Sequence, residues 1–241
     1  MLEGLYSAAA GMTAQQQRMD TLANDVANVN TTGYKHTRVA FRDLLYARDA
    51  SGVVSSGAGA AATPIGRGFG QGALRETGNK LDVAIEGDGF FQVRRANGTT
   101  ALTRDGSFRL DPTGRLTTQR GELLQPGITV PPGTSEADLA IAADGTVTAA
   151  NRPIGRIQLV TVRAPQALQS AGDSLFVANA ASGPATAMPA GRVVQGALES
   201  SNVDLADAMT QMMESQRSFQ MASKAVQMQD QILQIANEVK S

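Results

Sequence analysis

The chain has 241 residues, enough for one large domain or two small ones with a core of ordinary size. Its 21 basic and 22 acidic side chains give a formal net charge of -1, so no basic surface for nucleic acid or anionic lipid is predicted. Cysteine is absent, which excludes disulfides, thiolate metal ligands and cysteine nucleophiles. Aromatic residues are only 4% of the chain and tryptophan is absent, so we expect a thin, extended architecture.

The amino-terminal segment predicts a helix with one apolar face. Apolar residues recur there every seven positions, with companions three positions later, as in the a and d positions of a coiled coil. This row and its companions are Leu5, Met12, Met19, Leu22, Val26 and Val29. The segment carries Glu3 and no basic residue before Arg18, so it does not resemble a cleavable signal peptide. No apolar run in the sequence approaches the roughly 20 residues that span a bilayer.

A stretch rich in turn-forming residues, NDVANVNTTGYKH, follows this helix at residues 24–36. Its candidate functional residues are Asn24, Asn28, Asn30, Thr32, Gly33 and Tyr34. We expect the Asn and Thr side chains to satisfy backbone groups where the helix ends, and Gly33 to permit a reversal of the chain.

The middle of the sequence changes to the period of β-strands. Residues 84–124 alternate short runs with Asp-Gly and Asn-Gly pairs, which supply the positive φ angles of tight turns and predict an antiparallel meander. Further strands are predicted at residues 128–130, 140–143, 146–149, 154–162 and 193–198. Residues 47–72 are rich in Gly, Ala and Ser and predict a flexible connector.

A second seven-residue row predicts a long carboxy-terminal helix from about residue 204 to 239, roughly 50 Å long. Its members are Leu205, Met212, Phe219, Val226 and Leu233. Ser201 and Asp204 suit a capping box just before it. Because both rows have small or polar companions, we expect the helices to pack on helices; packing against a sheet is the alternative.

The predicted fold is therefore mixed α and β, with a central antiparallel β domain between long terminal helices. We predict four parts: a helix and turn at 1–46, the connector at 47–72, the β domain at 73–200 and the second helix at 201–241.

A search for catalytic chemistry finds no complete site. Gly172, Asp173, Ser174 and Leu175 spell the GDSL signature of a hydrolase family, but no histidine follows them to act as a base. The single histidine, His36, is expected to be solvated at the surface. The glycine-rich residues 66–72 lack the spacing and lysine of a phosphate loop. We predict no catalytic residue, no metal site and no cofactor.

Three segments resemble the flagellar rod and hook protein family. Residues 7–46 contain its asparagine-rich signature, read here as Asn24-x-x-x-Asn28-x-Asn30-Thr-Thr-Gly33-Tyr34-Lys35. LDVAIEGDGFFQV at residues 81–93 looks like the central β signature, and residues 196–233 look like the carboxy-terminal helix of these proteins.

This resemblance implies a structural subunit of the flagellar basal-body rod that self-assembles into a helical tube and transmits torque from motor to hook. The terminal helices would pair as a coiled coil lining the tube. Its partners would be identical subunits, other rod and hook proteins and the type III export apparatus, which would deliver it without a cleaved signal. Neither nucleic acid nor membrane insertion is expected. The segments look most like the distal rod members; a proximal rod paralogue and an extracellular β-rich binding module or adhesin are the alternatives.

Overall fold

The computed structural model describes residues 2–43, 59–188 and 191–240. The chain divides into two compact units. The helical unit contains residues 1–27, 37–65 and 204–241, and the β unit contains residues 28–36 and 66–203.

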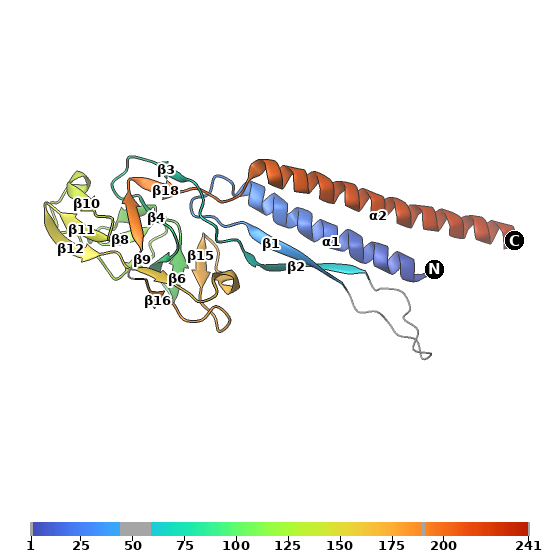
Figure 1. The fold of residues 1–241 in the computed structure, drawn as a ribbon, viewed down its shortest axis with the longest axis horizontal. Helices are drawn as coiled ribbons and strands as arrows, with labels where there is room; N and C mark the ends of the chain where they lie inside the picture. Colours follow the sequence, from blue (N-terminus) through green and yellow to red (C-terminus); the bar gives the residue numbers. More distant parts are fainter. Residues whose placement is uncertain (1, 44–58, 189–190, 241) are drawn as a thin grey trace. The chain divides into compact units, whose positions relative to one another are not determined.

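The helical unit consists of two long helices and a two-stranded sheet (Figure 1). Helix α1 (Leu2–Ala27) and helix α2 (Leu205–Lys240) lie side by side and run antiparallel, so that the amino terminus of α1 and the carboxy terminus of α2 share one end of the pair. Strands β1 (Thr37–Asp43) and β2 (Ala60–Arg67) form the sheet. Both predicted helices are confirmed.

The start of α2 differs from the predicted capping box. The Asp204 carboxylate accepts hydrogen bonds from the backbone N–H groups of Ala206 and Asp207 at 2.9 and 3.1 Å, which makes Asp204 itself the N-cap. Ser201 instead accepts from the N–H of Val203, before the helix begins. Its hydroxyl lies too early in the chain to reach the first free N–H groups of α2.

Strands β1 and β2 were not predicted from the sequence. The expected connector at 47–72 contains β2, while residues 44–58 lie outside the described part of the chain. Alanine and glycine dominate β2, and such residues have weak strand propensity. Its strand conformation depends on pairing with β1, which lies far away in sequence.

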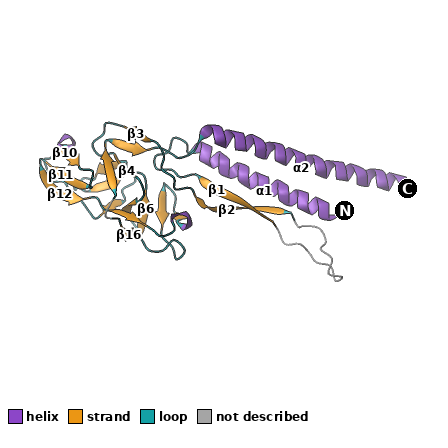
Figure 2. Cartoon of the chain, viewed as in Figure 1, coloured by secondary structure: helices purple, strands orange, loops and turns teal. Residues whose placement is uncertain are grey.

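The β unit is built from short strands and tight turns (Figure 2). Its strands are β3 (Leu74–Glu76), β4 (Val83–Glu86), β5 (Phe90–Arg94), β6 (Thr100–Thr103), β7 (Phe108–Leu110), β8 (Leu116–Thr118), β9 (Leu123–Gln125), β10 (Leu139–Ile141), β11 (Thr146–Ala149), β12 (Arg152–Arg156), β13 (Leu159–Thr161), β14 (Gln169–Ser170), β15 (Leu175–Val177), β16 (Thr186–Ala187), β17 (Arg192–Gln195) and β18 (Ala197–Glu199). The largest sheet has the order β14-β15-β6-β5-β9-β8-β7, with β13 also pairing with β5 and β16. Smaller sheets are β10-β11-β12, β17-β4 and β18-β3.

The antiparallel strands predicted over residues 84–124 are present as β4 to β9, but only β5–β6 and β7–β8–β9 pair in chain order. A continuous meander is not formed, because β4 pairs with β17 and β5 pairs with β9. The strand predicted at 128–130 is wrong, since Thr129 makes only an isolated bridge with Arg115. The segments predicted at 154–162 and 193–198 each form two strands. Gly196 separates β17 from β18 with a φ of 75°, a left-handed conformation that ends one ladder and starts another.

The core of the β unit lies on two faces of the large sheet. One cluster includes Phe91 and Phe108, whose rings meet edge to face with centroids 5.2 Å apart. The other gathers Phe69, Phe90 and Phe176, with two of the ring pairs about as close. The few aromatic residues of the chain are thus concentrated where they bury the most surface.

Phe91→Ala is expected to destabilise the β unit by about 3–5 kcal/mol, because the fully buried ring leaves a cavity and its partner Phe108 loses an edge contact. Urea unfolding followed by circular dichroism measures the change. Leu74→Ala, at a 40% exposed site on β3, is the control and should cost less than about 1 kcal/mol. Equal losses in the two variants would contradict this assignment of the core.

Candidate functional site

Residues 28–36 of the asparagine-rich stretch fold as part of the β unit, while residues 24–27, which include Asn24, form the end of α1. After α1 ends at Ala27, the Thr31 N–H donates to the carbonyl of Asn28 at 3.1 Å, and the Tyr34 N–H donates to the carbonyl of Thr31 at 3.4 Å. Gly33 has a φ of 64°. The chain reverses through a left-handed glycine, as expected from the sequence.

Gly33 also permits a close approach to the loop after β6. A Cβ at this position would lie 2.5 Å from the backbone nitrogen of Asp105, a distance that side chains do not tolerate. The adjacent Thr32 hydroxyl donates to the Asp105 carboxylate at 3.0 Å, and the Ser174 hydroxyl donates to the Thr32 carbonyl at 3.3 Å. Ser174 of the GDSL tetrapeptide thus helps to hold the turn.

Three segments distant in sequence meet beside this turn, and we call residues 33–36, 68–72 and 199–202 the clasp. The Gly33 N–H donates to the Glu199 carbonyl at 2.9 Å. The Asn202 side chain accepts from the His36 N–H at 2.9 Å and donates to the carbonyls of Gly68 and Gly70 at 2.7 and 3.0 Å. One amide side chain therefore bridges all three segments.

A buried cluster of charges lies at the centre of the clasp. The Glu199 carboxylate accepts from the Lys35 ammonium at 2.5 Å, the Gly72 N–H at 2.8 Å and the Arg104 guanidinium at 3.1 Å. Lys35 also donates to the Gly70 carbonyl at 2.8 Å. Lys35 and Glu199 are 0% exposed and Arg104 is 2% exposed. Such charges are tolerated in a protein interior because each is paired with an opposite charge. Removing one of the three side chains would therefore leave another charge buried without its partner.

Burial lowers the pKa of Lys35, because desolvation disfavours its charged form. The hydrogen bond and charge of Glu199 oppose this shift, and the nearby positive charge of Arg104 adds to it. The charge cluster therefore holds two cationic groups on one carboxylate, and burial more than their mutual repulsion lowers the pKa of the lysine.

His36 is not the solvated surface residue expected from the sequence. It is half-buried, and its Nδ1 lies 3.3 Å from the Asn202 side-chain oxygen. A Cβ on Gly68 would lie 2.1 Å from the imidazole ring, so this glycine makes room for it. The contact with residues 68 and 202 could not be anticipated from the local sequence.

The helix pair brings most residues of the two predicted apolar rows to half-buried positions. These are Met12, Met19, Val26, Met212, Phe219 and Val226. Leu22 is buried, Leu205 is exposed, and Val29 lies beyond the end of α1. The side chains of Leu5 and Leu233 lie outside the described part of the structure.

Small residues occupy the most buried positions of the helix pair. Ala14 on α1 and Ala208 and Ser215 on α2 are buried, and small side chains let helix backbones approach closely. Arg18 of α1 donates to the Gln211 side chain of α2 at 3.2 Å. The larger residues of the rows lie beside this line of contact and stay partly accessible.

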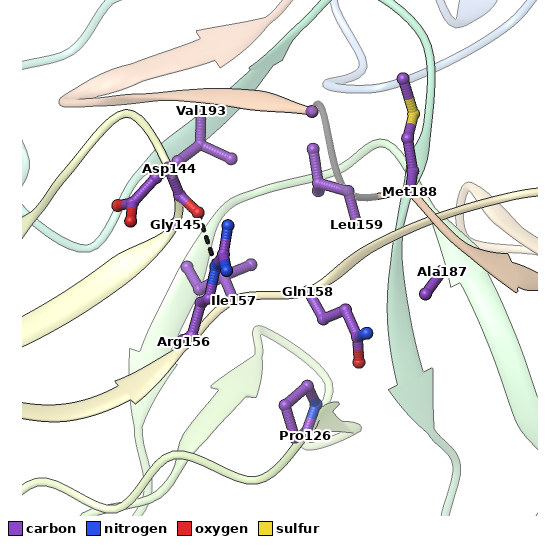
Figure 3. A pocket seen from close by; sticks show the side chains of 11 residues that line it. Pro126, Asp144, Gly145, Arg156, Ile157, Gln158, Leu159, Ala187, Met188 and Val193 are labelled. Carbon is purple, nitrogen blue, oxygen red and sulfur yellow. Dashed lines mark hydrogen bonds between the residues drawn. The ribbon is translucent and has the colours of Figure 1, made fainter.

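A cavity of about 360 Å³ lies in the β unit (Figure 3). Ile157, Leu159 and Val193 give it apolar walls, and the Arg156 Nε donates to the Asp144 carbonyl at 2.9 Å across one side. Hydrogen bonds from Thr146 lower the pKa of the Asp144 carboxyl. None of the described lining residues is a Ser, Cys, Lys or His, and Asp144 supplies the one carboxylate among them.

The described residues contain no group of three or more His, Cys, Asp or Glu side chains placed to hold a metal ion. No described helix combines the length and hydropathy of a membrane span.

The buried charge cluster is not predicted from the sequence. The turn signature contains Lys35, but no local motif points to Arg104, Glu199 or Asn202. A glutamate ending the apolar run of β18 was the available signal, since a carboxylate there requires a partner if it is buried. Its partner Lys35 is 164 residues away, beyond the reach of any local pattern.

Known protein families match three separate segments of the chain. Family models described as flagella basal body rod protein, flagellar hook protein FlgE/F/G D1 domain and flagellar basal body rod FlgEFG protein C-terminal match residues 5–35, 84–149 and 194–239. The flagellar basal-body rod protein FlgG of Borreliella burgdorferi is 39% identical over 265 residues, covering 100% of this chain and 99% of the relative. This chain belongs to the flagellar basal-body rod protein family.

Two further members of the rod family show the same full-length similarity. FlgG of Caulobacter vibrioides is 35% identical over 264 residues, with all of both chains covered. The rod protein FlgF of Salmonella typhimurium is 35% identical over 262 residues, covering 100% of this chain and 99% of the relative. Lys35, Arg104 and Glu199 each fall within a different matched segment, so the buried charge cluster joins the three segments that the family models match.

Glu199→Gln is expected to destabilise the β unit by about 3–5 kcal/mol, because it leaves two buried cations without a counter-charge. Urea unfolding measures the loss. Glu86→Gln removes an exposed partner of Arg192 and serves as the matched control, with an expected cost of at most about 1 kcal/mol. A loss below about 1 kcal/mol in Glu199→Gln would show that the cluster contributes little.

The lowered pKa of Lys35 predicts the direction in which the free energy of unfolding changes with pH. Between this pKa and the ordinary lysine value near 10.4, the unfolded chain binds a proton that the folded chain has released, so folding is favoured as pH rises. The free energy of unfolding of the protein, minus that of Lys35→Met, should therefore increase with pH in this alkaline window. Measuring both proteins in urea across the window tests the sign. A difference that falls or stays constant would contradict the desolvated lysine.

Proposed function

We propose that the protein is a structural subunit of the flagellar basal-body rod, assembling with copies of itself into a helical tube that transmits torque from motor to hook. The full-length similarity to rod proteins carries this proposal. It favours the rod subunit over an extracellular binding module, whose function would not require the family's terminal segments.

The terminal helices pair as a coiled coil in this proposal. Three observations support it: the seven-residue rows on both helices, their antiparallel side-by-side arrangement, and the hydrogen bond between Arg18 and Gln211. Packing against the other helix, not against a broad sheet, accounts for the small residues at the closest positions.

Self-assembly is supported by apolar side chains left uncovered on α2. They are Leu205, Met209, Met213, Met221, Met228, Ile232 and Ile235, each exposed by 44–65%. A long helix with apolar residues on more than its inner face is suited to contacts with further copies. When identical subunits meet through two different surfaces and the rotation does not close, a helical filament results.

The distal rod is the preferred place for this subunit, because proteins named FlgG match the whole chain at 39% identity in Borreliella burgdorferi and 35% in Caulobacter vibrioides. A paralogous rod position is the second candidate, since FlgF of Salmonella typhimurium also matches the whole chain at 35% identity.

Other rod and hook proteins are the proposed neighbours, and the basal body is the proposed location. We propose delivery by the flagellar type III apparatus without a cleaved signal. The subunit acts without a cofactor and is not an enzyme; in this proposal Ser174 and His36 serve the turn and the clasp.

Val226→Asp tests the assembly function, because it places a charge in the half-buried row between the helices. In cells lacking the chromosomal gene, this variant should fail to restore motility, and electron microscopy should show basal bodies with incomplete rods. Gln227→Asp adds the same charge at the next, exposed position and should restore both.

The purified Val226→Asp protein should keep a protease-resistant β unit, since residue 226 belongs to the helical unit. Complete rods and full motility with Val226→Asp would contradict the proposal.

A further inference from the structure

Helix α2 carries an apolar stripe on the side away from its partner helix. Met221, Met228, Ile232 and Ile235, which we call the α2 stripe, are 65%, 58%, 59% and 60% exposed. At 3.6 residues per turn they fall within an arc of roughly 60°, about opposite to the row that contains Phe219 and Val226. Because that row is the half-buried one, α2 cannot turn the stripe toward its own α1 without exposing the row.

A groove of matching chemistry lies elsewhere in the same unit, between α1 and the β1–β2 sheet. It consists of two neighbouring hollows of about 220 and 230 Å³ that share Thr21 and Val39, and we call it the α1–β1 groove. Its apolar lining residues are Leu22, Val39, Phe41, Ala62 and Pro64, and its polar lining residues are Gln17, Arg18, Asp20, Thr21, Thr37 and Gln211. Leu22 and Ala62 are buried, so the groove has an apolar floor. Phe41 is 42% exposed and forms an aromatic wall, with the Arg18 guanidinium 5.7 Å from the centre of its ring.

We propose that the α2 stripe of one copy binds in the α1–β1 groove of a neighbouring copy. The inference rests on the proposed rod function and names the two surfaces through which it operates. Each molecule carries both the α2 stripe and the α1–β1 groove, and the two surfaces are formed by different secondary-structure elements. A contact of this kind leaves one free stripe and one free groove after every addition, which is the requirement for a growing helical polymer.

The side chains of the stripe suit this role. Methionine is unbranched and adapts to irregular hollows, so Met221 and Met228 can fill the groove in the slightly different contacts that subunits of a curved polymer make. The isoleucines bury more rigid surface. Covering side chains that are more than half exposed supplies the driving force for the contact.

Charge complementarity points to the same pairing. Asp20 lines the groove and is exposed, and Lys224 lies on α2 roughly 20° from the edge of the stripe. Within residues 2–43, 59–188 and 191–240, neither side chain forms an ion pair. A stripe seated in the groove would bring an ammonium group to an open carboxylate.

Because the chain contains no cysteine, single introduced cysteines report this contact without background. Thr21→Cys and Met228→Cys proteins are mixed, allowed to polymerise and oxidised; a disulfide forms only where the two Cα atoms lie within about 7 Å. The mixture should yield the mixed dimer, identified by mass spectrometry of the linked peptides. Each variant alone should stay monomeric in denaturing gels.

Two matched controls define the geometry. Thr13 and Thr21 both donate to the carbonyl four residues earlier on α1, but Thr13 lies outside the groove, so Thr13→Cys should not link to Met228→Cys. Gln227→Cys is exposed but about 100° around α2 from Met228 and should not link to Thr21→Cys.

Polymers without the mixed dimer, or with Met228→Cys linked to itself, would overturn the groove assignment and leave the rod function standing. Failure of the unmodified protein to polymerise and to build rods in cells would overturn both.

A charge exchange provides an independent readout. Asp20→Lys and Lys224→Asp should each raise the critical concentration for polymerisation about fivefold, because each places like charges together. The double variant should restore the original value. Additive weakening in the double variant would contradict the pairing.

Discussion

The fold of the β unit depends on one buried carboxylate. Glu199 pairs with Lys35 and Arg104 and accepts from the backbone of residue 72, so three positions distant in sequence share a single acceptor. Removing water from these charges is costly, and the ion pairs and hydrogen bonds that they form with one another offset that cost. This makes the arrangement all-or-none: the segment that follows α1 and the segment that precedes α2 are fixed in the β unit together.

The surrounding residues show how that constraint is met by local chemistry. Gly33 lets the turn approach the Asp105 backbone, Gly68 makes room for His36, and Asn202 supplies both donors and acceptors to the neighbouring segments. The two glycines remove steric clashes, and the asparagine satisfies backbone hydrogen-bonding groups. These clashes and unpaired groups arise only when the segments meet. The asparagine-rich turn is therefore better understood as one part of a larger contact than as an isolated helix end.

The helical unit follows a different principle. Its deepest contacts are made by small residues, while larger apolar side chains remain half-buried on one face of α2 and exposed on another. A monomer that leaves methionine and isoleucine accessible on two sides of a long helix gains more from association than from further internal packing. The β unit buries its aromatic residues internally, so its stability does not require such a contact.

The sequence by itself determined the elements that local patterns specify: the seven-residue rows predicted both helices, and the Asp-Gly and Asn-Gly pairs predicted the short antiparallel strands β4 to β9 but not their order in the sheets. It also determined the family, because the asparagine-rich signature is a local feature. Only the tertiary structure decided that β2 pairs with β1 and that Lys35 meets Glu199. These results depend on contacts between separate segments of the chain, which carry no periodic signal in either segment alone.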